Sequence, residues 1–272
     1  MNYYKNREKL MHHAKEWNAK VKENLSEETN LSVGRTKYYP NNYTFGSFQT
    51  PDESKTPMII LQDMTTVEAI IYAHLYFPKK KIAALNFASY KHPGGMYIKG
   101  SSAQEESLCH SSNLYEILCH FKDTFYANNM KSLNHSLYTD NLLYTPDVIF
   151  FDTKDSSCDE IDFNDTRYRC DIITCAAPNA KAAEKYHNVS KSLIQTKMER
   201  RCLQVVKSAI DNQVNVLILG AFGCGVFGND PQYVSKILVD IVKQYGNYFD
   251  AVFFAIPRDS STRPFWLNIE ML

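Results

Sequence analysis

Short apolar runs that alternate with helical patterns from Met58 onward are the feature that most constrains this fold. The runs are nearly continuous, which is typical of strands buried on both faces of a sheet. Alternation of such strands with helices predicts an α/β sandwich with a mainly parallel or mixed sheet. We expect strands at Met58 to Gln62, Lys81 to Ser89, Val148 to Asp152, Asp171 to Ala176, Val214 to Leu219 and Ala251 to Ile256, and helices at Thr66 to Phe77, Ala103 to Phe121, Ser190 to Asn212 and Pro231 to Tyr245.

The first 57 residues follow a different pattern. Residues 2–25 carry apolar side chains at helical spacing, which predicts a covering helix, and the turn-rich segment after it predicts a short strand near Thr44 to Phe48. We therefore expect an N-terminal helical extension and connection over residues 1–57 and a larger α/β unit over 58–272, together one compact domain. Six acidic residues within 152–169 predict a solvated insertion.

The balance of charge excludes several classes of partner. Thirty basic and thirty acidic residues give a net charge of zero, so no overall field draws the chain to DNA, RNA or a membrane. No apolar stretch approaches the roughly 18 residues of a membrane span, and no leader pattern opens the chain. Seven cysteines without a repeated short spacing indicate thiols and no metal site. We expect a cytoplasmic monomer that needs no metal or cofactor.

A loop after the predicted strand at Lys81 to Ser89 combines two glycines with the start of a helix. Ligands of open α/β sheets lie outside the carboxyl ends of the strands, so such a loop is a candidate site. Gly94 and Gly95 allow the main chain to approach a phosphate or sugar closely, although a plain tight turn is the simpler alternative.

Gln104, Glu105 and Glu106 follow this loop at the expected start of a helix. Ser102 and Glu105 fit the spacing of a capping box, and carboxylates in a first helical turn are favoured by the helix dipole. Successive helical residues differ by about 100° in direction, so the two carboxylates point differently. One could face a ligand while the other braces a ribose hydroxyl or the loop.

A second glycine-rich loop follows the predicted strand at Val214 to Leu219. Gly223, Cys224, Gly225, Val226, Phe227 and Gly228 match G-x-G-x-x-G, and a helix begins at Pro231, which favours a diphosphate cradle. A dehydrogenase is disfavoured because the nearest acidic residue, Asp250, precedes its strand. Phe227 could stack on a ribose or belong to the core, and Cys224 is expected to pack and not to act as a nucleophile.

Taken together, these stretches resemble the microbial-type poly(ADP-ribose) glycohydrolases, a branch of the macrodomain superfamily. The resemblance covers about residues 58–257 and implies a three-layer α/β/α macrodomain with a mixed central sheet and an N-terminal helical extension. The residues that carry it are Leu85-Asn86-Phe87-Ala88, Pro93-Gly94-Gly95, Ala103 through Cys109, Ser112, Leu114-Tyr115, Ala176-Ala177-Pro178-Asn179 and Gly220 through Pro231.

The resemblance implies a site for ADP-ribose or poly(ADP-ribose), including chains on modified proteins. By resemblance Glu106 is the catalytic acid and base, Glu105 positions the ribose hydroxyls, and Asn86 binds the same ribose. Gly94, Gly95 and Gln104 are the further ligand-binding residues of the first loop. The loop from Gly223 to Gly228 wraps the diphosphate, and Phe227 packs against the terminal ribose. Asp63 is a candidate for contact with the adenine, with a turn or cap role as the alternative.

The implied reaction is hydrolysis of ribose–ribose glycosidic bonds. Such cleavage builds positive charge at the anomeric carbon, and a glutamate whose pKa is raised by burial and nearby negative charge can protonate the leaving oxygen. Met96 stands where the family has a third glycine, so we expect a difference in rate or substrate range. The alternatives are removal of single ADP-ribose units from proteins and a non-catalytic ADP-ribose reader.

Overall fold

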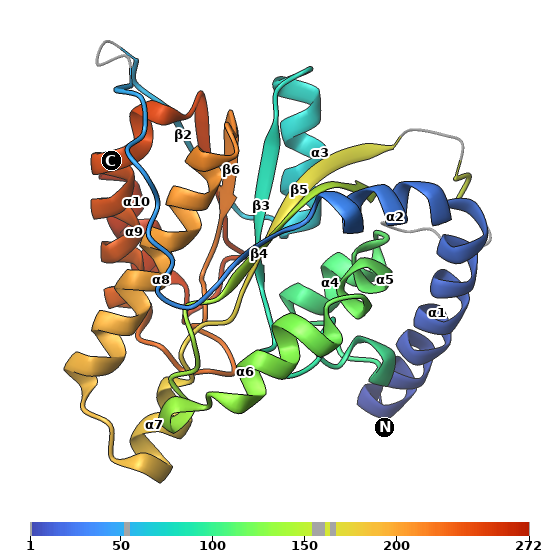
Figure 1. Cartoon of the computed structure of the whole chain (residues 1–272), viewed down its shortest axis with the longest axis horizontal. Coiled ribbons are helices and arrows are strands. Elements are labelled where there is room, and N and C mark those ends of the chain that lie inside the picture. The colour runs from blue at the N-terminus through green and yellow to red at the C-terminus, as the bar shows by residue number, and fades with distance from the viewer. Residues whose placement is uncertain (1, 52–54, 154–160, 164–166, 272) are drawn as a thin grey trace.

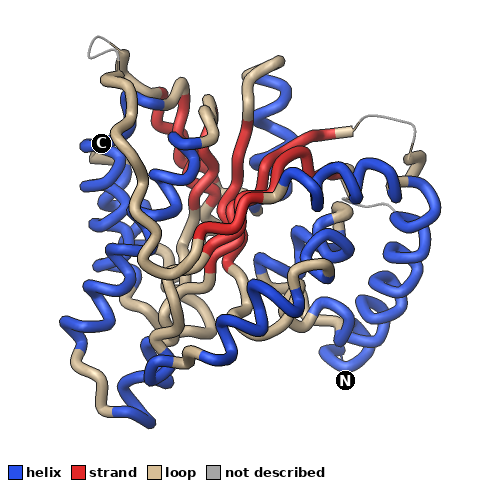
Figure 2. The backbone as a smooth tube through the Cα atoms, viewed as in Figure 1, coloured by secondary structure: helices blue, strands red, loops and turns tan. Residues whose placement is uncertain are grey.

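A computed structural model describes residues 2–51, 55–153, 161–163 and 167–271 of the chain. Within these residues seven strands form one central sheet in the order β1-β4-β5-β3-β6-β7-β2, with helices on both sides (Figures 1 and 2). The strands are β1 (Lys37–Tyr39), β2 (Met58–Gln62), β3 (Ile82–Phe87), β4 (Leu142–Phe150), β5 (Tyr168–Cys175), β6 (Val216–Leu219) and β7 (Ala251–Ala255).

The sheet is mixed, as the sequence predicts. Strands β2, β7, β6, β3 and β5 run parallel, whereas β4 is antiparallel to β5 and β1 is antiparallel to β4. The five parallel strands therefore end at one edge of the sheet, here called the carboxyl edge, and begin at the opposite edge, here called the amino edge. Ligands of parallel sheets bind outside the carboxyl ends, so this topology gives the two edges different roles.

Each face of the sheet buries one set of alternate side chains. In β6, Leu217 and Leu219 pack toward α8, α9 and α10, and Val216 and Ile218 pack toward the opposite helices. This gives three layers with the sheet between two helical ones (Figure 1). The helices are α1 (Asn2–Asn24), α2 (Ser26–Arg35), α3 (Thr66–Tyr76), α4 (Gln104–His110), α5 (Leu114–Cys119), α6 (Ala127–Lys131), α7 (Ala180–His187), α8 (Lys191–Asp211), α9 (Pro231–Tyr245) and α10 (Arg263–Ile269).

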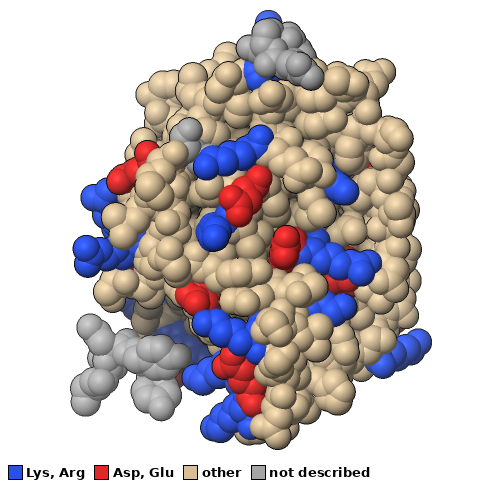
Figure 3. Space-filling model, turned by 90° about the vertical axis from the view of Figure 1, so that its left-hand side faces the viewer, with Lys and Arg blue, Asp and Glu red and all other residues tan. Residues whose placement is uncertain are grey.

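Helix α9 shows why these segments are helical. Asp230 caps it by accepting the N–H of Gln232, and Pro231 occupies its first turn, where no amide hydrogen is needed. A buried stripe at three- and four-residue spacing then faces the sheet. On the outer face of the α8, α9 and α10 layer, basic and acidic residues are interspersed (Figure 3), as expected for a chain without net charge.

The strand predicted at Val148 to Asp152 is the longer β4, and two other predicted elements are wrong in kind. Residues 44–48 form no strand, because Phe45 and Phe48 pack onto the core as an irregular segment, and the strand of this region is β1. The single helix expected over residues 103–121 is two helices, α4 and α5. The break lies at Ser112, which bridges to Phe150 of β4 and accepts the indole N–H of Trp17 through its carbonyl.

The N-terminal helices cover the α4 and α5 side of the molecule (Figure 1). Ala14, Trp17 and Val21 form the buried face of α1, which agrees with the covering helix expected there, whereas Met11 is exposed. Of the expected insertion, residues 154–160 and 164–166 lie outside the described residues, and Phe163 beside them packs against Trp17.

Over the described ranges, none of the helices combines the length and apolar character that a membrane crossing needs.

Candidate active site

The first turn of α4 brings its side chains to the carboxyl edge of the sheet. The capping box expected from Ser102 is absent, because the residue before the helix, Ala103, has no capping side chain. The carboxylate of Glu105 is used differently: its Oε2 accepts the N–H of Ser89 at 2.7 Å, just past β3. The acidic first turn therefore holds the loop that follows the strand.

Gln104 fixes α4 to the end of β3. Its Nε2 donates to the carbonyl oxygen of Leu85 at 2.8 Å, and its Oε1 accepts the N–H of Phe87 at 2.8 Å. The side-chain amide thus continues the hydrogen bonding of the strand. Because both glutamates follow directly in the helix, this connection sets where their carboxylates lie.

The loop at Gly94 and Gly95 packs directly against both carboxylates. Glu106 Oε1 accepts the N–H of Met96 at 2.8 Å. Gly95 has φ +58°, and a Cβ placed on it would lie 2.5 Å from Glu106 Oε1 and 3.0 Å from Glu105 Oε2. Only glycine fits there, which goes beyond the plain tight turn that the sequence left open.

The two carboxylates are buried, with 3% of Glu105 and 6% of Glu106 exposed. Burial and the neighbouring charge of Glu106 raise the pKa of Glu105 to about 8, although hydrogen bonds from the N–H of Ser89, the side chain of Asn86 and the N–H of Gly94 lower it. At neutral pH the pair therefore keeps a proton on Glu105, beside Glu106.

Asn86 lies at the end of β3 and is fully buried. Its Nδ2 is 3.4 Å from Glu105 Oε1 and 3.4 Å from the hydroxyl of Thr174 on β5. Among the residues that the structure describes, its Oδ1 has no hydrogen-bond partner. Buried acceptors of this kind are normally paired, so this oxygen is an unsatisfied acceptor beside Glu105.

The loop from Gly223 to Gly228 lies at the same edge, after β6. Gly223 and Gly228 have φ of +71° and +66°, and Cβ atoms on them would meet Ala177 and Lys181 of the neighbouring loop and helix. The N–H of Lys181 donates to the carbonyl of Phe227 at 3.0 Å, which ties this loop to the start of α7. Asn229 Nδ2 also donates to the carbonyl oxygens of Pro178 and Gly223.

The other side chains of this loop differ in burial and in what they contact. Burial raises the pKa of the Cys224 thiol to about 12, so it stays protonated and supports packing over nucleophilic attack. Phe227 is partly buried and packs on the core, while Val226 at the tip is exposed. No side chain near Gly225 would obstruct a Cβ there.

Two tyrosines that the sequence did not single out bridge the loops. The rings of Tyr90 and Tyr138 stack with centroids 3.7 Å apart, and Tyr138 lies 6.0 Å from Phe227. Arg201 was also missed: it is fully buried in α8 and donates to the carbonyl of Ala176 at 2.9 Å. Tyr138 adopts φ +59°, a conformation that no sequence pattern announces.

A cavity of about 200 Å³ adjoins Gln104 at this edge. Apolar walls come from Phe87, Ala221 and Pro257. Asp63 is exposed near it, and its carboxylate accepts the N–H of Arg258 at 2.8 Å, so the structure gives Asp63 the role of fixing a turn. The surface that lines the cavity is mostly apolar, as in many ligand pockets.

Helix α1 supports the first loop from outside. The hydroxyl of Tyr97 donates to Asn18 Oδ1 at 3.0 Å, and Arg7 Nε donates to the carbonyl of Lys99 at 2.8 Å. The loop that touches both carboxylates is therefore held on two sides. Within the described ranges, no group of three or more His, Cys, Asp or Glu side chains is arranged to hold a metal ion.

Comparison with known proteins gives this site a family. The model of the microbial-type PARG catalytic domain matches residues 7–153, which include the loop at Gly94 and the start of α4. A search of curated proteins found no match.

Solved structures match along nearly the whole chain. The poly(ADP-ribose) glycohydrolase of Thermomonospora curvata is 26% identical with a TM-score of 0.81, over 97% of this chain and 99% of that one. The same protein bound to the inhibitor ADP-HPD gives 26% and 0.80 over the same shares. The Deinococcus radiodurans enzyme in complex with ADP-ribose is 28% identical with a TM-score of 0.73, over 90% and 96%. With its paired glutamates, its glycine loops and this fold, the chain belongs to the microbial-type PARG family.

Proposed function

We propose that this chain hydrolyses the ribose–ribose glycosidic bonds of poly(ADP-ribose) and releases ADP-ribose. The observation that carries the proposal is the pair of adjacent buried carboxylates at the start of α4, held by two backbone N–H groups of the loop between β3 and α4 and keeping a proton at neutral pH. The related enzymes of known structure are poly(ADP-ribose) glycohydrolases, one of them bound to ADP-ribose.

The ligand follows the carboxyl edge in this proposal. The adenine ring enters the cavity beside Gln104, near Asp63, and the diphosphate lies along the loop from Gly223 to Gly228. The exposed tip of this loop leaves N–H groups and open space at Gly225 for an anion. The terminal ribose then reaches Asn86, whose free Oδ1 accepts a hydroxyl, with Phe227 against the sugar.

Glu106 acts as acid and then as base. As the glycosidic bond breaks, the proton that the carboxyl pair keeps at neutral pH passes through Glu106 to the leaving ribose oxygen, while the diphosphate stabilises the positive charge at the anomeric carbon. The resulting carboxylate accepts a proton from water, which adds to that carbon and restores the acid. Glu105, held on the N–H of Ser89, positions the ribose hydroxyls and helps to retain the proton of the pair.

The remaining parts of the proposal concern setting and organisation. We place the extension at residues 1–57 and the macrodomain at 58–272, although β1 of the extension completes the sheet. The described cysteines are free thiols, which supports a reducing cytoplasm. We further propose a monomer that acts on poly(ADP-ribose), including chains attached to proteins, without binding DNA or RNA and without a metal or cofactor.

A specific observation favours one second candidate, removal of single ADP-ribose units from proteins. Met96 replaces the family's third glycine and is 41% exposed directly beside Glu106, so the entrance to the site differs where an acceptor would lie.

To separate these functions, the protein is incubated separately with poly(ADP-ribosyl)ated and mono-ADP-ribosylated proteins, and released ADP-ribose is resolved. Release from the polymer alone supports the main proposal. Release from the mono-modified protein alone supports the second, and binding without any release would mean a reader.

A further inference from the structure

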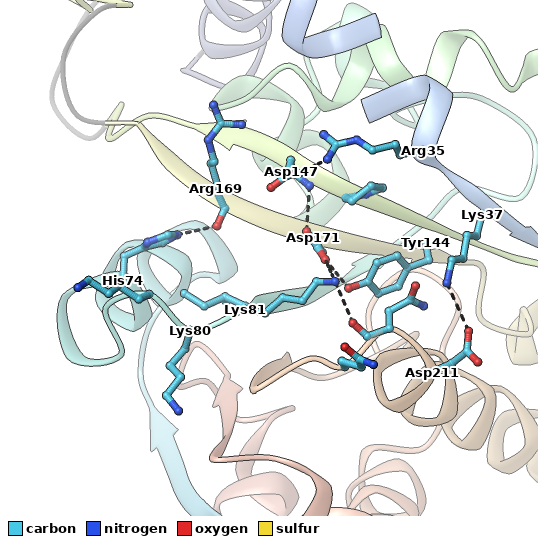
Figure 4. Close-up of a pocket in the computed structure, with 15 residues that line it drawn as sticks. Arg35, Lys37, His74, Lys80, Lys81, Tyr144, Asp147, Arg169, Asp171 and Asp211 are labelled. Atoms are coloured by element: carbon cyan, nitrogen blue, oxygen red, sulfur yellow. Dashed lines mark hydrogen bonds and ion pairs between the residues drawn. The ribbon is translucent and has the colours of Figure 1, made fainter. Parts of the chain in front are cut away.

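A cleft at the amino edge of the sheet, opposite the catalytic loops, gathers positive charge (Figure 4). It encloses about 660 Å³ between the starts of β3, β5 and β6 and the strand β4. In a chain without net charge, six basic and three acidic residues line this one cleft. They are Arg35, Lys37, Lys79, Lys80, Lys81, Arg169, Asp147, Asp171 and Asp211.

The acidic residues of the cleft are already neutralised. Each pairs with one cation, and Asp171 also accepts hydrogen bonds from the hydroxyl of Tyr144 and the N–H of Asp147. Figure 4 shows Lys81 pointing toward Asp171 and Tyr144. The ion pairs are Lys81 with Asp171 at 3.5 Å, Arg35 with Asp147 at 2.8 Å and Lys37 with Asp211 at 3.7 Å.

Two cations remain without a partner for their side chains among the described residues, Lys79 and Arg169. Both are exposed. Their backbones are held in place: the carbonyl of Arg169 contacts the ring of His74 on α3 at 2.6 Å, and Lys79 sits at φ +67° in the turn before β3. The cleft thus presents unpaired positive charge on a fixed frame, a setting that attracts anions.

We propose that this cleft binds phosphate groups of a poly(ADP-ribose) chain at a point remote from the bond being cleaved, an inference that rests on the proposed function. Each unit of the polymer carries a diphosphate, so a long chain presents repeated anions. The six-residue strand β3 separates the two edges by about 20 Å. A chain of several units can follow the surface from one edge to the other, whereas a single ADP-ribose fills one site only.

The consequence is a preference for long chains. Phosphate contacts made by lysine and arginine release counterions and depend strongly on salt. A polymer held at the amino edge stays bound to the enzyme after one ADP-ribose unit is released at the carboxyl edge. This raises the local concentration of the remaining polymer at the catalytic site. Short chains gain nothing from the cleft.

The test measures binding of labelled long poly(ADP-ribose) to the full chain carrying Glu106→Gln, with ADP-ribose added to saturate the catalytic site. The cleft variant adds Lys79→Glu and Arg169→Glu. The matched control adds Lys236→Glu and Lys243→Glu, two exposed residues of α9 on another face of the molecule. Both variants change the charge equally.

We expect the cleft variant to lose about tenfold in affinity and about two units of the salt slope, one for each cation removed, while the control stays near the parent. Equal loss in both variants would overturn the inference, as would complete displacement of the polymer by ADP-ribose. Single-stranded DNA of the same charge that binds equally well would show a nucleic-acid surface instead. Hydrolysis of short chains by the wild type, measured separately, tests the proposed function, and the cleft substitutions leave it unchanged.

Discussion

The two edges of the sheet handle charge in opposite ways. At the carboxyl edge two carboxylates are buried, and each is held by a backbone N–H in a loop where a Cβ on Gly95 would collide. At the amino edge an open cleft displays lysine and arginine side chains, two of them unpaired. Bond cleavage needs groups fixed within fractions of an ångström, whereas capture of a polyanion needs only charge within reach.

Glu106→Gln breaks the carboxyl edge with the largest expected effect. Glutamine keeps the Oε1 that accepts the N–H of Met96 but carries no transferable proton. We expect turnover on poly(ADP-ribose) to fall about a thousandfold, the usual range for a general acid, with binding of ADP-ribose retained. Release kinetics and calorimetry measure the two quantities. An unchanged rate would remove Glu106 from the mechanism.

Gly95→Ala tests whether close packing of the loop is needed. The added Cβ would meet both carboxylates at a residue with φ +58°, so the loop must move. A displacement near 1 Å costs about a hundredfold in rate, and we expect that loss with a lower Tm. Gly34→Ala, in α2 with nothing within 4 Å of its Cβ, is the matched control and should keep the parent rate. Equal rates for the two variants would show that the loop does not depend on this packing.

The raised pKa of Glu105 predicts how stability depends on pH. The folded protein holds this proton up to a pKa of about 8, whereas the unfolded chain releases it near 4.5. Between these values the native state binds more protons, so stability falls as pH rises, by on the order of a few kcal/mol in total. Denaturant unfolding at pH 5 and pH 8 measures this fall. Glu105→Gln should flatten the difference, and a variant that keeps the full slope would assign it to other groups.

Met96→Gly carries the smallest expected effect. Met96 has φ −107°, which any residue adopts, so the backbone does not require the family's glycine. Removal of its partly exposed side chain opens the entrance beside Glu106. We expect a change of less than about fivefold in kcat/KM, equivalent to ~1 kcal/mol, with a shift in the ratio of polymer to mono-modified substrate. An unaltered ratio would show that Met96 does not set substrate choice.

The sequence predicted much of the carboxyl edge and none of the amino edge. The strands at Met58 to Gln62 and the helix at Pro231 to Tyr245 have the predicted limits, because buried periodicity and the cap at Asp230 act locally. The loops with Gly95 and Gly223 could be found because only glycine tolerates such contacts. The stack of Tyr90 on Tyr138 could not be predicted, because the two residues are far apart in sequence and only the folded chain brings their rings together.

The basic cleft escaped prediction for a related reason. Lys79, Arg169 and Lys37 come from separate segments, and a net charge of zero concealed their convergence. The capping box at Ser102 was wrong for the opposite reason. Ser102 and Glu105 have the spacing of a capping box, but in the structure the carboxylate of Glu105 is buried beside that of Glu106 and accepts the N–H of Ser89. Tertiary contacts can override a cap when they bury a carboxylate with better partners.

The most direct test of the division between the edges is a crystal structure of Glu106→Gln with ADP-ribose. We expect the diphosphate to lie along the loop from Gly223 to Gly228 and the terminal ribose to lie against Asn86 and Glu105, with the adenine beside Gln104. ADP-ribose bound only in the basic cleft between Lys79 and Arg169, with the carboxyl edge empty, would contradict it.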